Sequence, residues 1–309
     1  MNRTPDPALL QAAARYSAEK GELSAELMPE MRRRSREARR ALRGRHADEV
    51  EISTCDGLRL FSPRDRCDAS RVIVYLHGGG WANCDTVTHG GIMTDLAALS
   101  GHLVAGPDYP LAPEHPYPAG LDAACAAVCR IAADHPHAAL VLAGDSAGAN
   151  LALATALRLH DEGAAPPLAA LLLWYGCFRR CFDTRSHMTY GDGTYGLTTT
   201  DMRTYWDWYL ADHRDPAYGD LTGAAVDGLP PCFLAEAEMD CLADDTRWLA
   251  GRLTQAGIPH AYDFTPAVNH GFIHFSQVYE PSYRSLQAAA HFLASPIVAP
   301  AAERRTAAR

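Results

Sequence analysis

The sequence contains a single lysine, Lys20, among its 309 residues. Schiff-base catalysis, P-loop phosphate binding and protein kinase chemistry each need a lysine in a structured core, whereas Lys20 lies in a polar N-terminal stretch. The SAEK that ends at Lys20 matches the SxxK of penicillin-binding enzymes, but those enzymes need a second lysine in a KTG element. The lack of lysine therefore excludes these classes of enzyme.

Long apolar runs and paired cysteine motifs are also missing. No stretch of about 18 consecutive apolar residues is present, and the first residues do not resemble a charged-then-apolar leader. The nine cysteines include no CxxC pair, which favours reduced thiols and argues against zinc. We expect a cytoplasmic protein that has no membrane partner and needs no metal or other cofactor.

The formal net charge of −9 disfavours nucleic acid as a partner. Residues 31–46 depart from this balance, because they contain eight arginines and one acidic residue. A phosphate- or membrane-binding role is one interpretation of this segment. A solvated helix face, on which arginine stems cover apolar neighbours, is the favoured one, and the role of the segment stays open.

Apolar or alternating segments typical of strands recur along the chain. Eight strands are expected, at EVEIST, LRLFS, RVIVYL, HLVAGP, ALVLAG, LAALLLWY, CFLAEAE and AYDF. Helical patterns occupy 89–100, 118–134, 147–161, 244–256 and 283–294. The alternation predicts an α/β fold with a mostly parallel sheet and helices on both faces, in which ligands bind at the carboxyl ends of the strands.

Two segments interrupt the alternation, namely the Arg-rich start, 1–47, and 183–216, between the sixth and seventh strands. The second is rich in tyrosine and tryptophan and holds a helix that Thr199 or Thr200 can cap. We expect both to contribute to a helical lid, 1–47 as an N-terminal segment and 183–216 as an insertion in a catalytic domain over 48–297. Residues 298–309 are expected to form a flexible tail.

The pentapeptide Gly144-Asp145-Ser146-Ala147-Gly148 joins the fifth predicted strand to an alanine-rich helix. In this context GxSxG indicates a nucleophile elbow, a sharp turn whose small residues let a serine hydroxyl project at the end of the sheet. Ser146 is therefore the predicted nucleophile. A serine hydroxyl needs a base and an orienting acid, which in this arrangement follow in the order Ser, Asp or Glu, His.

His270 is the predicted base, because it lies in a loop just past the last strand, beside a glycine that suits such a loop. The other downstream histidines, His260, His274 and His291, precede a strand or fall in or near helical stretches.

The acid should stand where the seventh strand ends, which favours Asp240 and leaves Glu238 as the alternative. Glu236 lies inside the strand. Asp244 and Asp245 begin the following helix, where capping or the helix dipole explains them.

The segment His77-Gly78-Gly79-Gly80-Trp81 follows the third predicted strand. Acyl transfer develops an oxyanion that backbone N–H groups must stabilise, and side chains would block the approach of that backbone. We predict an oxyanion hole formed by Gly78, Gly79, Gly80 and Ala147, the residue after the nucleophile. A dinucleotide-binding loop is excluded because neither the G-x-G-x-x-G spacing nor a following helix is present.

Together, HGGGW and GDSAGAN resemble the bacterial hormone-sensitive-lipase-like branch of the α/β-hydrolase esterases. The stretches DYPLAPEHPYPAGLDA, LPPCFLAEAEMDCL and AVNHGF extend the resemblance over about residues 45–294. It implies an α/β-hydrolase fold and a Ser146, Asp240, His270 triad. It also implies that Gly79, Gly80 and Ala147 donate to the oxyanion while Gly78 shapes the loop. Cys241 departs from the family, which commonly has proline after its acid.

We expect a serine carboxylic-ester hydrolase that acts on small to medium acyl esters through an acyl-enzyme. Trp81, Tyr195, Trp206 and Tyr209 are the candidates for substrate binding. An amidase, lactonase or acyltransferase with the same triad is one alternative, and a non-catalytic small-molecule binding protein is another. The expected partner is a small ester, and homodimer formation stays open.

Overall fold

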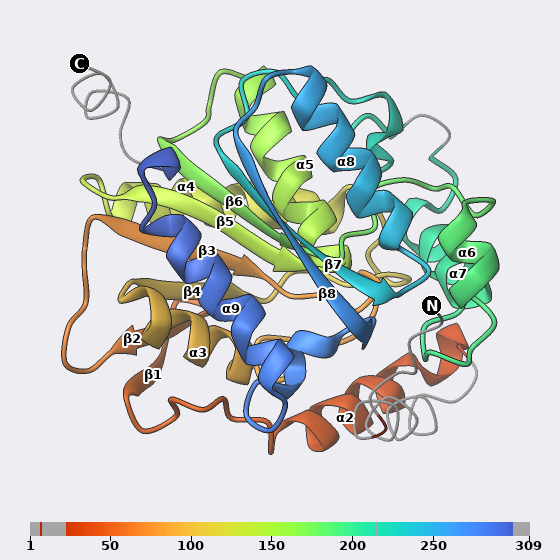
Figure 1. The fold of residues 1–309 in the computed structure, drawn as a ribbon, viewed down its shortest axis with the longest axis horizontal. Helices are drawn as coiled ribbons and strands as arrows, with labels where there is room; N and C mark the ends of the chain where they lie inside the picture. Colours follow the sequence, from red (N-terminus) through yellow and green to blue (C-terminus); the bar gives the residue numbers. More distant parts are fainter. Residues whose placement is uncertain (1–6, 8–22, 214–215, 299–309) are drawn as a thin grey trace.

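An eight-stranded sheet lies between two layers of helices in the computed structural model, which describes residues 7, 23–213 and 216–298 (Figure 1). The strands are β1 (Val50–Cys55), β2 (Leu58–Pro63), β3 (Arg71–Leu76), β4 (Leu103–Pro107), β5 (Ala139–Asp145), β6 (Leu168–Trp174), β7 (Cys232–Met239) and β8 (His260–Asn269). The longer helices are α2 (Met28–Arg39), α3 (Gly90–Ser100), α4 (Ala119–Asp134), α5 (Ala147–Asp161), α6 (Arg185–Tyr190), α7 (Thr199–Leu210), α8 (Ala243–Gln255) and α9 (Glu280–Leu293). Four short 3-10 helices are η1 (Ala25–Leu27), η2 (Leu221–Gly223), η3 (Phe272–Phe275) and η4 (Pro296–Val298).

The strand order is β1-β2-β4-β3-β5-β6-β7-β8. The pairs β1·β2 and β2·β4 are antiparallel, and every other pair is parallel, which confirms the predicted mostly parallel sheet. Because parallel strands end at the same edge, the segments after β3, β5, β7 and β8 are brought together there.

Alternate residues of the central strands supply two separate apolar cores. On β3, Val72, Val74 and Leu76 face the core that includes α4, α5 and α8. The intervening Ile73 and Tyr75 face the core that includes α3 and α9. This period of two, with apolar residues on both faces, is the reason the sequence shows continuous apolar runs at these strands.

The insertion after β6 contributes α6 and α7. Thr198 caps α7, since its hydroxyl accepts from the Asp201 N–H while the Asp201 carboxylate accepts from the Thr198 N–H. The predicted cap at Thr199 or Thr200 was therefore wrong by one or two residues, because an N-cap precedes the first helical residue.

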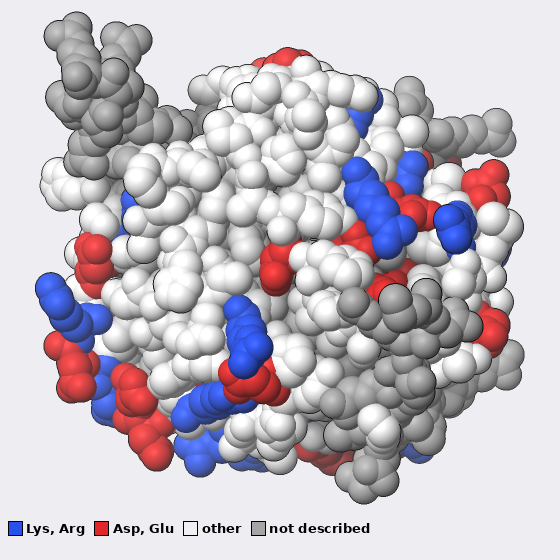
Figure 2. Space-filling model, in the orientation of Figure 1, with Lys and Arg blue, Asp and Glu red and all other residues white. Residues whose placement is uncertain are grey.

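Parts of the predicted lid and tail, 1–6, 8–22 and 299–309, lie outside the described residues. Val298, placed in the tail by the sequence, ends η4 and is buried. Among the described residues, no helix has the length and apolar character needed to cross a membrane. Blue and red side chains are interleaved at the lower left of Figure 2, where Figure 1 places β1 and β2.

We predict opposite effects of alanine at two helical glycines. Gly251 is exposed in α8 and a Cβ there meets nothing within 4 Å, so Gly251→Ala should stabilise by about 0.5–1 kcal/mol. At Gly148 in α5 a Cβ would lie 2.0 Å from the Leu76 carbonyl oxygen, so Gly148→Ala should destabilise by about 1–3 kcal/mol. Urea denaturation measures both, and equal effects would contradict the close packing of α5 on β3.

Candidate active site

Ser146 occupies a tight turn between β5 and α5. Its φ of 54° and ψ of −121° are rare for a residue with a side chain, and 6% of its surface is exposed. This tight turn requires glycine on both sides of the serine, since a Cβ on Gly144 would lie 2.5 Å from the backbone of Gly148. The local sequence thus forces the serine side chain out at the carboxyl edge of the sheet.

Ser146, His270 and Asp240 form a continuous chain of contacts. Ser146 Oγ lies 2.9 Å from His270 Nε2, and His270 Nδ1 lies 2.7 Å from Asp240 Oδ2. The Asp240 side chain is fully buried, and its Oδ1 accepts from the Leu242 N–H at 2.9 Å. A carboxylate on Nδ1 fixes the proton there in the neutral ring, which leaves Nε2 as the acceptor for the serine proton.

The alternative residues lie elsewhere. The Glu238 carboxylate accepts from the Ala267 N–H at 2.7 Å, and Glu236 contacts Arg247 and Tyr262. His274 Nε2 lies 3.1 Å from Arg39 Nη1. Asp240 is therefore the acid that the structure brings to His270.

The glycine loop after β3 lies against the nucleophile turn. Gly79 and Gly80 have positive φ values of 119° and 63°. A Cβ on Gly79 would lie 2.1 Å from the Asn83 carbonyl oxygen, and one on Gly80 would lie 2.4 Å from the Tyr205 ring. In the described residues, the N–H groups of Gly79, Gly80 and Ala147 have no hydrogen-bond partner, so they remain the predicted oxyanion donors.

Gly78 differs from its neighbours, because its N–H donates to Asp145 Oδ1 at 3.0 Å. Its inclusion among the predicted oxyanion donors is therefore corrected: this N–H is already used inside the protein. A Cβ on Gly78 would lie 2.6 Å from Asp145 Oδ2. Gly78 thus shapes the loop by letting it close on Asp145, the role that the family resemblance implied.

Asp145 is a supporting residue that the sequence analysis did not single out. Besides Gly78, Oδ1 accepts from the Tyr75 hydroxyl at 2.8 Å and lies 3.2 Å from His89 Nε2. Burial alone would raise the pKa of the Asp145 carboxyl, but His89, His274 and the hydrogen bond from Tyr75 together outweigh burial and hold that pKa below its usual range. An ionised carboxylate therefore ties the loop after β3 to the end of β5.

The carboxylate of Asp145 and the rings of His89 and His274 lie close enough together to approach a cation. The Arg39 guanidinium lies beside this group, with Nη1 3.1 Å from His274 Nε2. Its positive charge opposes a metal ion, so we interpret the cluster as internal support for the loop.

Helix α2 fixes the segment after the glycines. Arg32 Nε donates to the Ala82 carbonyl at 2.8 Å, Asn83 Nδ2 donates to Ser35 Oγ at 2.9 Å, and Arg39 Nη1 contacts Cys84 Sγ at 3.2 Å. Arg32, Ser35 and Arg39 are spaced by three and four residues, so they share one face of the helix. Part of the Arg-rich segment is therefore bound to the active-site loop and is not a solvated face.

Three of the four predicted substrate-binding residues form a closed aromatic cluster beside the loop. Trp81 stacks on Tyr209, with ring centroids 4.2 Å apart and planes 4° apart, and lies 4.6 Å from Trp206. All three are at most 1% exposed. Tyr195 lies apart from them, where its carbonyl accepts from Asn269 Nδ2 at 3.0 Å, next to His270. Contact of these four residues with substrate stays a prediction.

We predict that the free energy of unfolding decreases as the pH falls from 6.5 towards 4. Burial, reinforced by His89, lowers the pKa of His77 from 6.5 to about 4, so the unfolded chain binds this proton first. The stabilisation is complete above pH 6.5 and is lost through this window. His77→Asn, which can keep the N–H donor to the Gly78 carbonyl, should reduce the slope by up to about 1.4 kcal/mol per pH unit.

Urea denaturation of both proteins at several pH values between these limits measures the two slopes. Parallel slopes for the wild type and His77→Asn would contradict the assignment of this proton to His77.

The comparisons with known proteins agree with this geometry. A family model described as an α/β-hydrolase fold matches residues 73–274. Acetyl esterases from Salmonella choleraesuis (strain SC-B67) and Salmonella schwarzengrund (strain CVM19633) are each 36% identical to this chain over 252 residues, which cover 78% of this chain and 77% of the relative.

Among solved structures, a hyperthermophilic esterase from the archaeon Pyrobaculum calidifontis is 28% identical. It superimposes with a TM-score of 0.84 over 96% of this chain and 100% of its own. An esterase from the bacterial hormone-sensitive lipase family has a TM-score of 0.84 at 23% identity, over 93% of this chain and 98% of its own, and this likeness concerns the fold alone.

Proposed function

The chain belongs to the α/β-hydrolase family; we propose that it is one of the hormone-sensitive-lipase-like esterases and hydrolyses small to medium acyl esters through an acyl-enzyme on Ser146. The observation that carries the proposal is the unbroken contact from Ser146 Oγ through His270 to Asp240. A non-catalytic binding protein would have no need of this chain of contacts in a strained turn.

His270 acts first as a base. Ser146 Oγ attacks the ester carbonyl carbon as Nε2 accepts its proton, and the carbonyl π electrons move to oxygen. Collapse of the tetrahedral intermediate breaks the bond to the alkoxy oxygen, and His270 donates its proton to the leaving alcohol. Water then repeats the sequence on the acyl-enzyme, and the carboxylic acid leaves. Asp240 stabilises the imidazolium in both halves.

The oxyanion is stabilised by backbone N–H groups of Gly79, Gly80 and Ala147. Support comes from their lack of other partners in the described residues and from the bare backbone at both glycines. Loss of one such donor typically costs about 100- to 1000-fold in rate.

The aromatic residues of α7 favour short acyl chains. The Tyr205 ring lies directly over Gly80, and Trp206 and Tyr209 close the space beside Trp81. Large rings packed against the loop leave little room for a long chain, and the two Salmonella relatives are acetyl esterases.

Several expectations from the sequence remain proposals. We propose that α2 and the 183–216 insertion form a lid over the body of 48–297, and that the protein acts in the cytoplasm. We also propose that it has no nucleic acid or membrane partner. Support for a lid comes from the contacts of α2 with the glycine loop and of α7 with Gly80. A measurement of the protein's mass in solution would show whether the chain forms a homodimer.

We predict that aryl acetate and butyrate are hydrolysed faster than laurate, because the ring cluster limits the acyl site. If none of the esters in this panel is hydrolysed, the esterase proposal is rejected.

We also predict that a fluorophosphonate adds one phosphonyl group to the wild type and none to Ser146→Ala, as measured by intact mass. Equal labelling of the wild type and Ser146→Ala would reject Ser146 as the nucleophile.

We predict that Asp240→Asn lowers kcat by about 10⁴-fold, because the amide favours the wrong imidazole tautomer. Glu238→Gln is the matched control two residues earlier in the chain, since the Glu238 carboxylate accepts from the Ala267 N–H and does not contact His270. Its kcat should stay within about threefold of the wild type. A larger loss in Glu238→Gln than in Asp240→Asn would reverse the assignment of the acid.

A further inference from the structure

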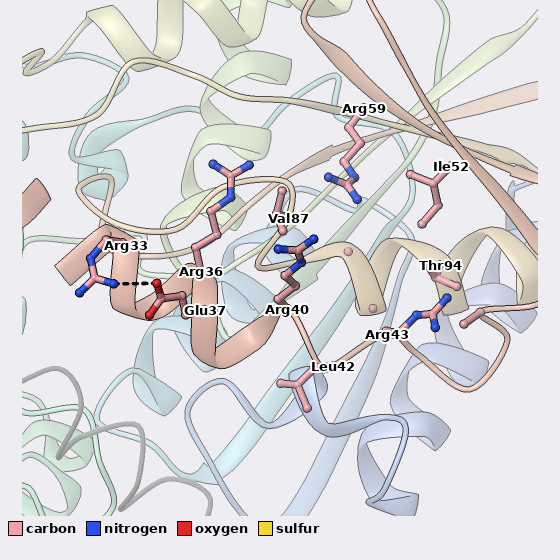
Figure 3. Close-up of a pocket in the computed structure, with 13 residues that line it drawn as sticks. Arg33, Arg36, Glu37, Arg40, Leu42, Arg43, Ile52, Arg59, Val87 and Thr94 are labelled. Atoms are coloured by element: carbon pink, nitrogen blue, oxygen red, sulfur yellow. Dashed lines mark hydrogen bonds and ion pairs between the residues drawn. The ribbon is translucent and has the colours of Figure 1, made fainter. Parts of the chain in front are cut away.

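A cavity of about 720 Å³ lies between α2, the turn that follows it, β1, β2 and the start of α3 (Figure 3), and neither Ser146 nor His270 lines it. Five of its lining residues are arginines and one is acidic, which is an excess of positive charge in a protein with a net charge of −9. The lining residues include Arg33, Arg36, Glu37, Arg40, Arg43 and Arg59.

The pairing of these arginines is uneven. Arg33 is neutralised by Glu30 and Glu37, at 2.7 and 2.6 Å. Arg36 Nε lies 3.3 Å from Asp85 Oδ2. Within the described part of the chain, no carboxylate forms an ion pair with the guanidinium groups of Arg40, Arg43 and Arg59.

Arg59 is the most unusual of the five. It lies on β2, and its Nε is buried without a hydrogen-bond partner in the described residues. Burial is the largest influence on the Arg59 guanidinium and lowers its pKa. Asp85 opposes this shift, Arg36 adds to it, and Asp108 opposes it again. A buried guanidinium N–H without an acceptor is costly, and an oxygen of a bound ligand would remove that cost.

The arginines converge in space. In Figure 3 the side chains of Arg36, Arg40 and Arg59 extend towards the region around Val87. Guanidinium groups bind phosphate oxygens through paired N–H donors, which a carboxylate-lined or apolar cavity could not do. The volume lies within the range of small-molecule sites, and Leu42, Ile52 and Val87 offer apolar surface for the rest of a ligand.

We propose that this cavity binds a phosphorylated small molecule, whose phosphate groups contact Arg36, Arg40 and Arg59. The site is separate from Ser146, and it assigns a function to the part of the Arg-rich segment that does not hold the glycine loop. Acidic residues border it, among them Glu37 and Asp85, which makes it unsuited to a long polyanion such as nucleic acid.

Pyrophosphate and ATP are suitable probes, titrated by calorimetry at about 0.15 M salt, where weak surface electrostatics are screened. We expect a dissociation constant of about 0.1 mM or lower for at least one of them, and a matching rise in the unfolding temperature. Vesicles of phosphatidylglycerol, with phosphatidylcholine vesicles as the reference, test whether a lipid phosphate is the ligand instead.

Arg40→Gln and Arg59→Gln should each weaken binding by roughly tenfold or more, which corresponds to about 1.4 kcal/mol. Arg34→Gln is the matched control, because Arg34 is on the same helix, pairs with Glu30 and does not line the cavity. Without ligand, Arg59→Gln should be about as stable as the wild type, since it removes a partly buried side chain whose Nε has no acceptor. A cooperative unfolding transition in urea, measured for each variant without ligand, shows that it is folded whether or not it hydrolyses esters.

The expected set of results is binding by the wild type, loss in both cavity variants and no loss in Arg34→Gln. The proposal is overturned by absence of binding to both soluble probes, by binding to the anionic vesicles alone, or by equal weakening in all three variants. Ser146→Ala should bind the probes as the wild type does, so failure of the esterase proposal leaves this test intact.

Discussion

The carboxyl ends of β3 and β5 are so close that no side chain fits between them. A Cβ on Gly144 would lie 2.7 Å from the Leu76 carbonyl oxygen, and one on Gly148 would lie 2.0 Å from it. This contact sets the distance between the nucleophile turn and the glycine loop. Because the contact is between backbone atoms, the positions of the Ser146 turn and the glycine loop depend little on side-chain rotamers. Backbone N–H donors held in place in this way are what the stabilisation of an oxyanion requires.

The sheet and the three residues of the proposed triad were predictable from the sequence, because each depends on a pattern of neighbouring residues. The period-two and apolar runs predicted the sheet, because strands buried on both faces must be apolar throughout. The order of Ser146, Asp240 and His270 followed from the elbow and from the ends of two strands. The choice of Asp240 over Glu238 depended on where β7 ends, and the structure places Asp240 just past Met239.

The supporting contacts were not predictable, because they join residues far apart in the chain. Nothing near Ser35 indicates that it meets Asn83, and nothing in GxSxG indicates that Asp145 holds Gly78. The loop after Asp240 is similar: where the family commonly has proline, Ser186 from the insertion donates to the Cys241 carbonyl at 2.7 Å. A long-range hydrogen bond there supplies restraint that the missing proline does not.

The stack of Trp81 on Tyr209 has an optical consequence. Trp81 directly follows the three glycines, whereas Trp206 and Tyr209 belong to α7, and the ring contacts join these two parts of the molecule. Two of the chain's five tryptophans therefore sit at the boundary between the catalytic loop and the insertion. Any separation of α7 from the loop would change the polarity around both indoles, so the fluorescence of Trp81 and Trp206 would report such a movement.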